Sequence, residues 1–328
     1  MKDARLDVFL AQQHPQYSRS RIKTLIDEGF VLVDGQKRKP SFTLKGGEQI
    51  VLTRRAPDIP KAKPENIPLQ ILHEDGDLMV INKAVGMVVH PAPGHYEGTL
   101  VSAVMHHLSG GHSVLPPEPP NGARSDGVNP ILACGNFRPG IVHRLDKGTS
   151  GVMVIAKNDE TLGALMNQFK NRTVIKHYRA LVFGTLRGKS GTIRKAIGRD
   201  NVHRRKFSSK SRNPREAVTH YEVVEVMGGV SLLTLRLETG RTHQIRVHLS
   251  EEKHPIVGDT VYGARSYLSS IRSDRLREGL LLVSRPLLHS WRLSFKHPRT
   301  SVALNFEAPL PDDFESALNL LRFGEKAS

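Results

Sequence analysis

Apolar positions in the first 56 residues follow a helical period and then alternate as they do in strands. The predicted elements are helices at 6–10 and 21–28 and strands at 30–33 and 50–52. Ser18-Arg19-Ser20 predicts the N-terminal cap of the second helix, and Gly29 ends it. The apolar residues that share one face of this helix are Ile22, Leu25 and Ile26. The pattern therefore predicts a small unit of helices with a small sheet at 1–56.

Residues 57–67 are rich in proline and charge and have no apolar period, which predicts a semi-extended linker. Strand patterns dominate the rest of the chain, 68–328. The predicted strands are 69–73, 78–83, 152–156, 177–184, 219–226 and 231–237, of which the last two form a hairpin. Because short turns join these strands and regular βαβ units are few, we expect an α+β fold with a mainly antiparallel mixed sheet, flanked by helices and loops.

Three further segments stand out in this larger region. A helix is predicted at 159–170, and its apolar face is formed by Leu162, Leu165, Met166 and Phe169. Residues 109–139 are rich in Gly, Pro and Asn and predict a long surface loop. Residues 194–215 are densely basic and predict a finger that would suit phosphates on a hairpin, the alternative being a mobile charged loop.

The formal charge of +16 over 328 residues suits a polyanionic partner, with nucleic acid as the first candidate and an ordinary basic enzyme as the alternative. The single cysteine, Cys134, excludes an intrachain disulfide and a cysteine-based metal site. The charged N-terminus lacks an apolar signal core, and no apolar run approaches the length of a membrane span. We therefore expect a soluble, cytoplasmic protein without a membrane partner.

One carboxylate, Asp146, lies among the basic residues His143, Arg144 and Lys147, just before a Gly-Thr-Ser-Gly turn. Cationic neighbours stabilise a charged carboxylate, and loops often carry reacting groups. Taken alone, the segment fits a surface ion pair or turn residue better than an active site. The choice between an active site and a surface ion pair or turn residue therefore depends on the other polar clusters of the chain.

A second polar cluster covers 238–249, at a predicted strand-to-helix junction, and supplies Arg241, His243, Arg246 and His248. The spacing of the two histidines could suggest a metal, but no acidic or cysteine third ligand stands at a suitable spacing, so no metal site is expected. The arginines suit a carboxylate or phosphates as partners. Glycine-rich dinucleotide and nucleotide-triphosphate loops are absent from the sequence, as is a Gly-x-Ser-x-Gly elbow.

The N-terminal unit resembles the S4 RNA-binding domain. The matching strings are Arg5-Leu6-Asp7, Ser18-Arg19-Ser20-Arg21, Leu25-Ile26, Gly29 to Val33, Asp34-Gly35 and Leu44-x-Gly46. The resemblance implies that the second helix presents Arg19, Arg21 and Lys23 to RNA phosphates, whereas a plain solvated helix face is the alternative.

Residues 68–328 resemble the RluA-type pseudouridine synthases, and together with the S4 unit the layout is similar to the RluD-like large-subunit ribosomal RNA branch. The strings that carry the resemblance are Glu74-Asp75-x-Asp77-Leu78-x-Val80-Ile81-Asn82-Lys83, Gly86 to Pro91, His143-Arg144-Leu145-Asp146 with Thr149-Ser150-Gly151, Lys176-x-Tyr178, Gly240 to Arg246 with His248, and Pro255 to Asp259 with Tyr262-Gly263. One departure concerns Gly148, since many relatives have an acid at that position.

The resemblance implies that Asp146 is the aspartate that attacks the target nucleotide. It implies that Tyr178 lies against the target base as a candidate for proton removal, and that Arg246 pairs with the aspartate. Arg144 matches an arginine that assists the flip of the target uridine out of the RNA stack. The other residues expected to support RNA binding are His143, Arg241, His243, Arg204, Arg205 and Lys206.

The expected activity is a cofactor-free isomerisation of uridine in RNA by a monomer, with no metal. Large-subunit ribosomal RNA or a pre-ribosomal particle is the expected substrate, and transfer RNA is the alternative. Two other classes stay open: a non-catalytic RNA-binding or ribosome-assembly protein of the same fold, and a nucleic-acid N-glycosylase or other hydrolase that uses Asp146. The second of these would release free uracil.

Overall fold

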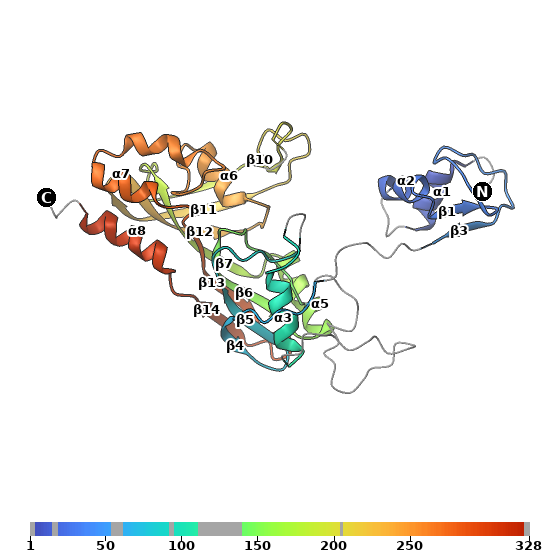
Figure 1. Ribbon diagram of the computed structural model, residues 1–328, viewed down its shortest axis with the longest axis horizontal. Helices are drawn as coiled ribbons and strands as arrows, with labels where there is room; N and C mark the ends of the chain where they lie inside the picture. The colour runs from blue at the N-terminus through green and yellow to red at the C-terminus, as the bar shows by residue number, and fades with distance from the viewer. Residues whose placement is uncertain are drawn as a thin grey trace. The chain divides into compact units, whose positions relative to one another are not determined.

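The computed structural model describes residues 4–14, 19–53, 62–91, 95–110, 140–203 and 206–324, apart from the side chain of Arg21. The chain divides into two compact units, Met1–Ile59 and Pro60–Ser328 (Figure 1). Several predictions fall outside the described residues: Arg204 and Arg205, the side chain of Arg21, Cys134, the Ser18 position of the predicted cap, residues 57–61 of the predicted linker and residues 111–139 of the predicted loop.

The first unit consists of α1 (Leu6–Gln13), α2 (Arg19–Asp27), β1 (Val31–Val33), β2 (Gln36–Lys37) and β3 (Ile50–Leu52). Its strands form an antiparallel sheet in the order β2-β1-β3. The predicted apolar face of α2 is confirmed, because Ile22, Leu25 and Ile26 are buried in one cluster. Gly29 follows α2 with a φ of +85°, and the amide of Phe30 bonds back to Leu25. This left-handed step, which glycine adopts at low cost, ends the helix as predicted.

The second unit is built on a nine-stranded sheet in the order β4-β5-β6-β13-β7-β12-β11-β8, with β14 paired to β13. The strands are β4 (Gln70–Glu74), β5 (Leu78–Lys83), β6 (Ser150–Ala156), β7 (Ile175–Phe183), β8 (Ser190–Arg194), β11 (Val218–Met227), β12 (Val230–Leu237), β13 (Leu288–Lys296) and β14 (Ala303–Glu307). Among the described strand pairs of this sheet, β6–β13 alone is parallel, so the predicted mixed, mainly antiparallel sheet is confirmed. Among the described helices, none is long and apolar enough to cross a membrane.

All seven residues of β6 are buried because both faces of the sheet are covered there. Met153 and Ile155 belong to a core that includes Leu100 and Val104 of α3 (Leu100–Leu108). Val152 and Val154 face the other way, into a core that includes Leu165 of α5 (Asp159–Lys170). Because side chains alternate between the two faces of a strand, β6 contributes residues to both cores. This burial fixes the start of β6, which directly follows the Asp146 loop.

The remaining helices are α6 (Gln244–Glu251), the 3-10 helix η2 (Ala264–Ser270), α7 (Asp274–Leu281) and α8 (Asp312–Phe323). In Figure 1, α7 and α8 lie at the opposite end of the sheet from α3 and α5. Their cores are formed with Phe183, Val230 and Leu232. The elements α3, α7, α8, β8, β13 and β14 were not predicted.

The helix predicted at 159–170 is confirmed as α5, with Asn158 capping the amide of Thr161. Met166 was wrongly assigned to its apolar face, since the residue is 55% exposed, whereas Leu165 is fully buried. The predicted finger contains a short antiparallel pair, β9 (Gly198–Arg199) and β10 (Phe207–Ser208).

Candidate active site

Asp146 lies on the loop that leads into β6, and its side chain is 20% exposed. The amide of Thr149 donates to the carbonyl of Asp146 at 3.0 Å and closes a turn directly after it. Two distant groups bind the same loop, since the amide of Gly86 donates to the Lys147 carbonyl at 2.9 Å and Arg285 Nη1 donates to the Gly148 carbonyl at 3.1 Å. Carbonyl contacts of this kind hold the backbone of the loop, and with it the carboxylate.

Arg246 on α6 is the main partner of Asp146, with 3.1 Å between Nη1 and Oδ2. The same guanidinium binds Asp259 in a bidentate manner, at 2.6 Å from Nε to Oδ2 and 3.0 Å from Nη2 to Oδ1. Burial acts to lower the pKa of Arg246, but the hydrogen bonds and charges of Asp259 and Asp146 outweigh burial and raise it. Arg246 is therefore a permanently charged clamp, fixed by Asp259 on one side and directed at Asp146 with its remaining nitrogen.

His243 approaches the same carboxylate, with 3.8 Å between its Nε2 and Asp146 Oδ2. Its Nδ1 lies 2.8 Å from the hydroxyl of Tyr262, and that hydroxyl accepts the amide of Phe207 at 2.9 Å. Burial lowers the pKa of His243, while Asp146 acts in the opposite direction. In the tautomer with the proton on Nε2, Nδ1 accepts the phenol proton and the ring presents its N–H toward Asp146.

Tyr178 on β7 forms the wall of the site, with only 7% of the residue exposed. Burial raises the pKa of Tyr178 to about 12, partly offset by a hydrogen bond with Ser290. The side chain is therefore a neutral phenol at physiological pH. Its ring offers an aromatic face on which a planar base can stack.

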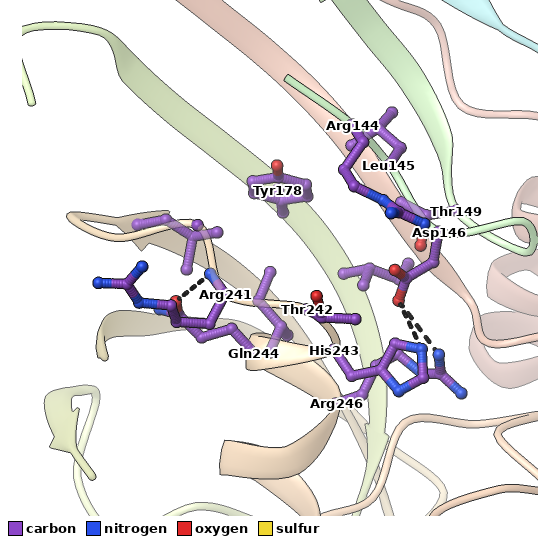
Figure 2. A pocket seen from close by; sticks show the side chains of 14 residues that line it. Arg144, Leu145, Asp146, Thr149, Tyr178, Arg241, Thr242, His243, Gln244 and Arg246 are labelled. Atoms are coloured by element: carbon purple, nitrogen blue, oxygen red, sulfur yellow. Dashed lines mark hydrogen bonds and ion pairs between the residues drawn. The ribbon is translucent and has the colours of Figure 1, made fainter. Parts of the chain in front are cut away.

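Figure 2 shows these side chains around one pocket, coming from the Asp146 loop, from β7 and from the turn into α6. The pocket is lined by Arg144, Leu145, Asp146, Thr149, Tyr178, Leu237, Gly240, Arg241, Thr242, His243, Gln244, Ile245, Arg246 and Leu288. Arg144 is exposed at this pocket. Arg241 is fixed by a bond from Nε to the Glu216 carbonyl at 3.1 Å. The structure thus brings Arg144, Asp146, Tyr178, Arg241, His243 and Arg246 together.

His143 makes internal contacts. Its Nε2 accepts the amide of Val154 at 3.1 Å, and its ring stacks on Phe169 with 4.8 Å between centroids. Burial, and then the charge of Lys176, lowers the pKa of His143 to about 3, so the ring is neutral. These contacts support the Asp146 loop, and they do not supply the positive charge that binding of a phosphate would use.

The other predicted RNA-binding residues are not part of this pocket. Arg19 pairs with the buried Asp7 at 2.9 Å, and its side chain stays 58% exposed. Lys23 is exposed on α2, and Lys206 is half-buried in the hairpin. Arg19 and Lys23 lie on α2 of the first unit.

Asp259, Tyr262 and Arg285 were not identified as functional from the sequence. Asp259 and Tyr262 stand in the string Pro255 to Gly263, which carried part of the family resemblance but no role. Arg285 precedes β13 and is bound by Asp313 at the start of α8, at 2.6 Å. For Asp259 and Tyr262 the signal in the sequence was their place in that string, whereas Arg285 lies outside every string that carried the resemblance.

Gly148 remains the point at which this loop departs from many similar sequences. A Cβ added there would lie 3.0 Å from Cδ of Pro286 and 3.7 Å from Cβ of Arg285. A side chain at this position would press on the segment that holds the loop, so the absence of a side chain lets Arg285 and Pro286 pack closely against it.

Within the described ranges, Asp75, Asp77 and His297 form a group whose ligand atoms could surround a metal ion. The carboxylates already have partners: Asp75 accepts the amides of Asp77 and Leu78, and Asp77 pairs with Arg299. These three residues therefore belong to a network of hydrogen bonds and ion pairs. His243 and His248 do not converge on a metal, because His248 binds Thr219 and the Lys195 carbonyl.

Comparison with known proteins gives a consistent result. A family model for RNA pseudouridylate synthase matches residues 77–251, and one for the S4 domain matches residues 4–50. An uncharacterized RNA pseudouridine synthase of Chlorobaculum parvum is 43% identical over 324 residues, covering 97% of this chain and 94% of the relative. Ribosomal large subunit pseudouridine synthase D of Pseudomonas aeruginosa is 39% identical, covering 98% and 93%. The solved structure of human RNA pseudouridylate synthase domain containing 4 is 29% identical with a TM-score of 0.55, covering 77% and 93%.

Proposed function

The chain belongs to the RNA pseudouridylate synthase family, and we propose that it isomerises a uridine of large-subunit ribosomal RNA with Asp146 as the reacting group. The observation that carries this assignment is the convergence of Asp146, Arg246 and Tyr178 in one pocket, from segments up to 100 residues apart. The names of relatives such as ribosomal large subunit pseudouridine synthase D support this choice of RNA.

The reaction breaks the bond between N1 of the base and C1′ of the ribose and forms a bond between C5 and C1′. The proton on C5 is lost, and N1 gains a proton, so the isomerisation balances without an oxidant or a cofactor. The base has to turn within the pocket before it rejoins the sugar, which requires walls that keep it from escaping. Tyr178 and Leu237 line such a pocket together with Asp146.

In this proposal Arg246 fixes one oxygen of Asp146 at 3.1 Å and leaves the other free for the nucleotide. Two routes are compatible with that geometry: addition of the carboxylate to C1′, or removal of the 2′ proton to give a glycal. Deuterium at C2′ of the target uridine separates them, because only the second route breaks the C2′–H bond and gives a primary isotope effect.

We propose that Tyr178 stacks on the target base and that its hydroxyl takes part in proton transfer at C5. Because burial raises the pKa of Tyr178 to about 12, the phenol must first pass its own proton on before it can accept another. Arg144 and Arg241, at the edge of the pocket, are assigned to the RNA strand on either side of the flipped nucleotide.

The experiment that tests the function is a pseudouridine map of ribosomal and transfer RNA from a strain that lacks the protein, compared with the same strain complemented by wild type or by Asp146→Asn. We expect one or more sites in large-subunit RNA to disappear and to return only with wild type. Loss of a transfer RNA site would redirect the substrate assignment, and loss of no site would contradict the proposal.

Purified Asp146→Asn should bind the target RNA with nearly unchanged affinity and form no pseudouridine. The matched control is Asp274→Asn, since Asp274 is 76% exposed and pairs with Arg277 on the same helix. An assay for free uracil with the wild type excludes the glycosylase alternative if no base is released.

A further inference from the structure

A second cavity lies directly beside the Asp146 pocket and has a volume of about 380 Å³. The two spaces share lining residues: Arg144, Tyr178, Leu237, Gly240 and Arg241. The second cavity continues past Tyr178 to the end of α5 and the start of β7, where Phe169, Lys170, Arg172 and Lys176 line it. A ligand in the Asp146 pocket can therefore extend into this cavity.

The lining of the second cavity is strongly cationic. Arg144, Lys170, Arg172, Lys176 and Arg241 line it, and Glu238 is its one acidic residue. Glu238 is already bound to His220 at 2.6 Å, and Arg172 is paired with Glu216 at 3.0 Å outside the cavity. The neutral ring of His143 adds no charge. The cavity thus holds more positive charge than its own side chains neutralise.

Among the cations of this lining, Arg144, Lys170 and Arg172 are exposed to water, whereas Lys176 is not. It is half-buried, and within the part of the chain that the structure describes its ammonium has no hydrogen-bond acceptor and no ion-pair partner. Burial, and then the charge of Arg172, lowers the pKa of Lys176 to about 8, so the side chain is still mostly protonated at pH 7. A cation removed from water without a partner is unfavourable, which indicates that an anion belongs beside it.

The position of Lys176 relates this anion to the target base. Lys176 precedes Tyr178 by two residues on β7, so the two side chains point to the same face of the strand, roughly 7 Å apart along it. A backbone phosphate that neighbours a base on Tyr178 is therefore within reach of Lys176.

We propose that the cavity around Lys176 binds a backbone phosphate of the substrate RNA next to the flipped uridine, with Lys176 as its central contact. The proposal rests on the proposed function in that it takes RNA as the ligand. It assigns a binding role to the Lys176 of the Lys-x-Tyr string and explains why the cation is left uncompensated in the free protein.

The test compares Lys176→Gln with the wild type, with Lys176→Arg as the charge-conserving variant. Lys296→Gln is the matched control, since Lys296 is an exposed lysine at the end of β13 outside this cavity. Binding of a large-subunit ribosomal RNA transcript is measured at several salt concentrations. Lys176→Gln should weaken binding about five- to tenfold at low salt and reduce the slope of log K against log salt by roughly 0.7–0.9, the contribution of one phosphate contact.

In turnover, Lys176→Gln should raise KM more than it lowers kcat, while Lys176→Arg should retain most of the affinity. The thermal midpoint of Lys176→Gln should be equal to or higher than that of wild type, because the variant removes a half-buried cation that has no partner among the described residues. A purely structural lysine would give the opposite sign. Unchanged binding and salt slope, or a lower midpoint that accounts for the loss of binding, would overturn the proposal.

Neutral substitutions in the RNA backbone identify which phosphate Lys176 contacts. Once the target uridine is mapped, a synthetic stem-loop carries a neutral methylphosphonate at one linkage at a time near that uridine. At one linkage the neutral group should weaken binding by wild type and Lys296→Gln but not by Lys176→Gln. Equal losses for all three proteins at every linkage would exclude Lys176 as the contact. These readouts measure binding, so they remain informative even if the wild type forms no pseudouridine in the chosen RNA, an outcome that would instead count against the proposed function.

Discussion

Asp259→Asn is the perturbation that tests how the carboxylate of Asp146 is held. The side chain of Asp259 is 1% exposed, and it accepts two bonds from Arg246 and the amides of Val261 and Tyr262. Asparagine keeps the shape of the residue but removes its charge and turns an NH₂ group toward donors that need an acceptor. Among the described residues, Arg246 then retains Asp146 as its charged partner.

The magnitude follows from the burial of the pair. Removing one member of a buried ion pair costs about 3–5 kcal/mol; Asp146 alone then compensates the Arg246 charge, at 3.1 Å through one nitrogen. For a domain of this size that corresponds to a fall in the thermal midpoint of roughly 6–20 °C. Asp274→Asn breaks an exposed pair within one helix and should cost no more than about 0.5 kcal/mol.

Rates should respond as well, because Arg246 sets the position of Asp146. A displacement of a reacting group by about 1 Å can cost on the order of 100-fold. We therefore expect single-turnover pseudouridine formation by Asp259→Asn to fall about 10- to 100-fold at a temperature where the variant is folded. RNA affinity should change less than about threefold, since Asp259 does not line the pocket.

The assay combines thermal unfolding, RNA binding and single-turnover kinetics on the same preparations of wild type, Asp259→Asn and Asp274→Asn. If Asp259→Asn is as stable as Asp274→Asn and forms pseudouridine within twofold of the wild-type rate, Asp259 does not hold Arg246 in place. A rate that falls only in proportion to lost RNA binding would likewise exclude this role of Asp259.

Three further predictions concern Gly151, Tyr178 and Lys176. Gly151→Ala should destabilise the protein by about 3 kcal/mol, because its φ is +111° and a Cβ would lie 2.1 Å from the Ser290 carbonyl oxygen. Gly163 lies on α5, and a Cβ added there meets nothing within 4 Å. Gly163→Ala should therefore raise the free energy of unfolding, measured by chemical denaturation, by about 0.5–1 kcal/mol. Tyr178→Phe should bind RNA like wild type and lose about 10²- to 10⁴-fold in single-turnover rate, whereas a loss below tenfold would limit the role of Tyr178 to stacking. The pKa of Lys176 is about 8 in the folded chain and 10.5 in the unfolded chain. Between these pH values the unfolded chain binds more protons, so the free energy of unfolding should rise with pH across that window. Lys176→Gln should lack this part of the rise in urea titrations, and equal slopes for the two proteins would contradict the assigned pKa.

The local elements around the site could be predicted from the sequence alone. The apolar run of β6, the hairpin of β11 and β12, and the bounds of α5 follow from periods of two and 3.6 residues, which report burial of neighbouring positions. The element that completes the sheet, β13, pairs in parallel with β6 across about 140 residues, and a local pattern carries no record of that partner.

Site residues divide in the same way. Their types and the strings that contain them were legible in the sequence, and with them the family and the chemistry that a carboxylate, an arginine and a tyrosine can perform. The partners of these residues could not be predicted from the sequence, because an ion pair or a stacked ring depends on which side chains the fold brings within a few ångströms.

Taken by itself, the sequence determined the family, the order of the two units and the identity of Asp146 as the candidate reacting group. The tertiary structure decided that Asp259 holds Arg246 and that His143 is a neutral support. It also left Lys176, beside Tyr178, without a partner among the residues that the structure describes. The physical reason is range: hydrophobic periodicity and turn chemistry act between near neighbours in the chain, whereas charge compensation and burial act between near neighbours in space.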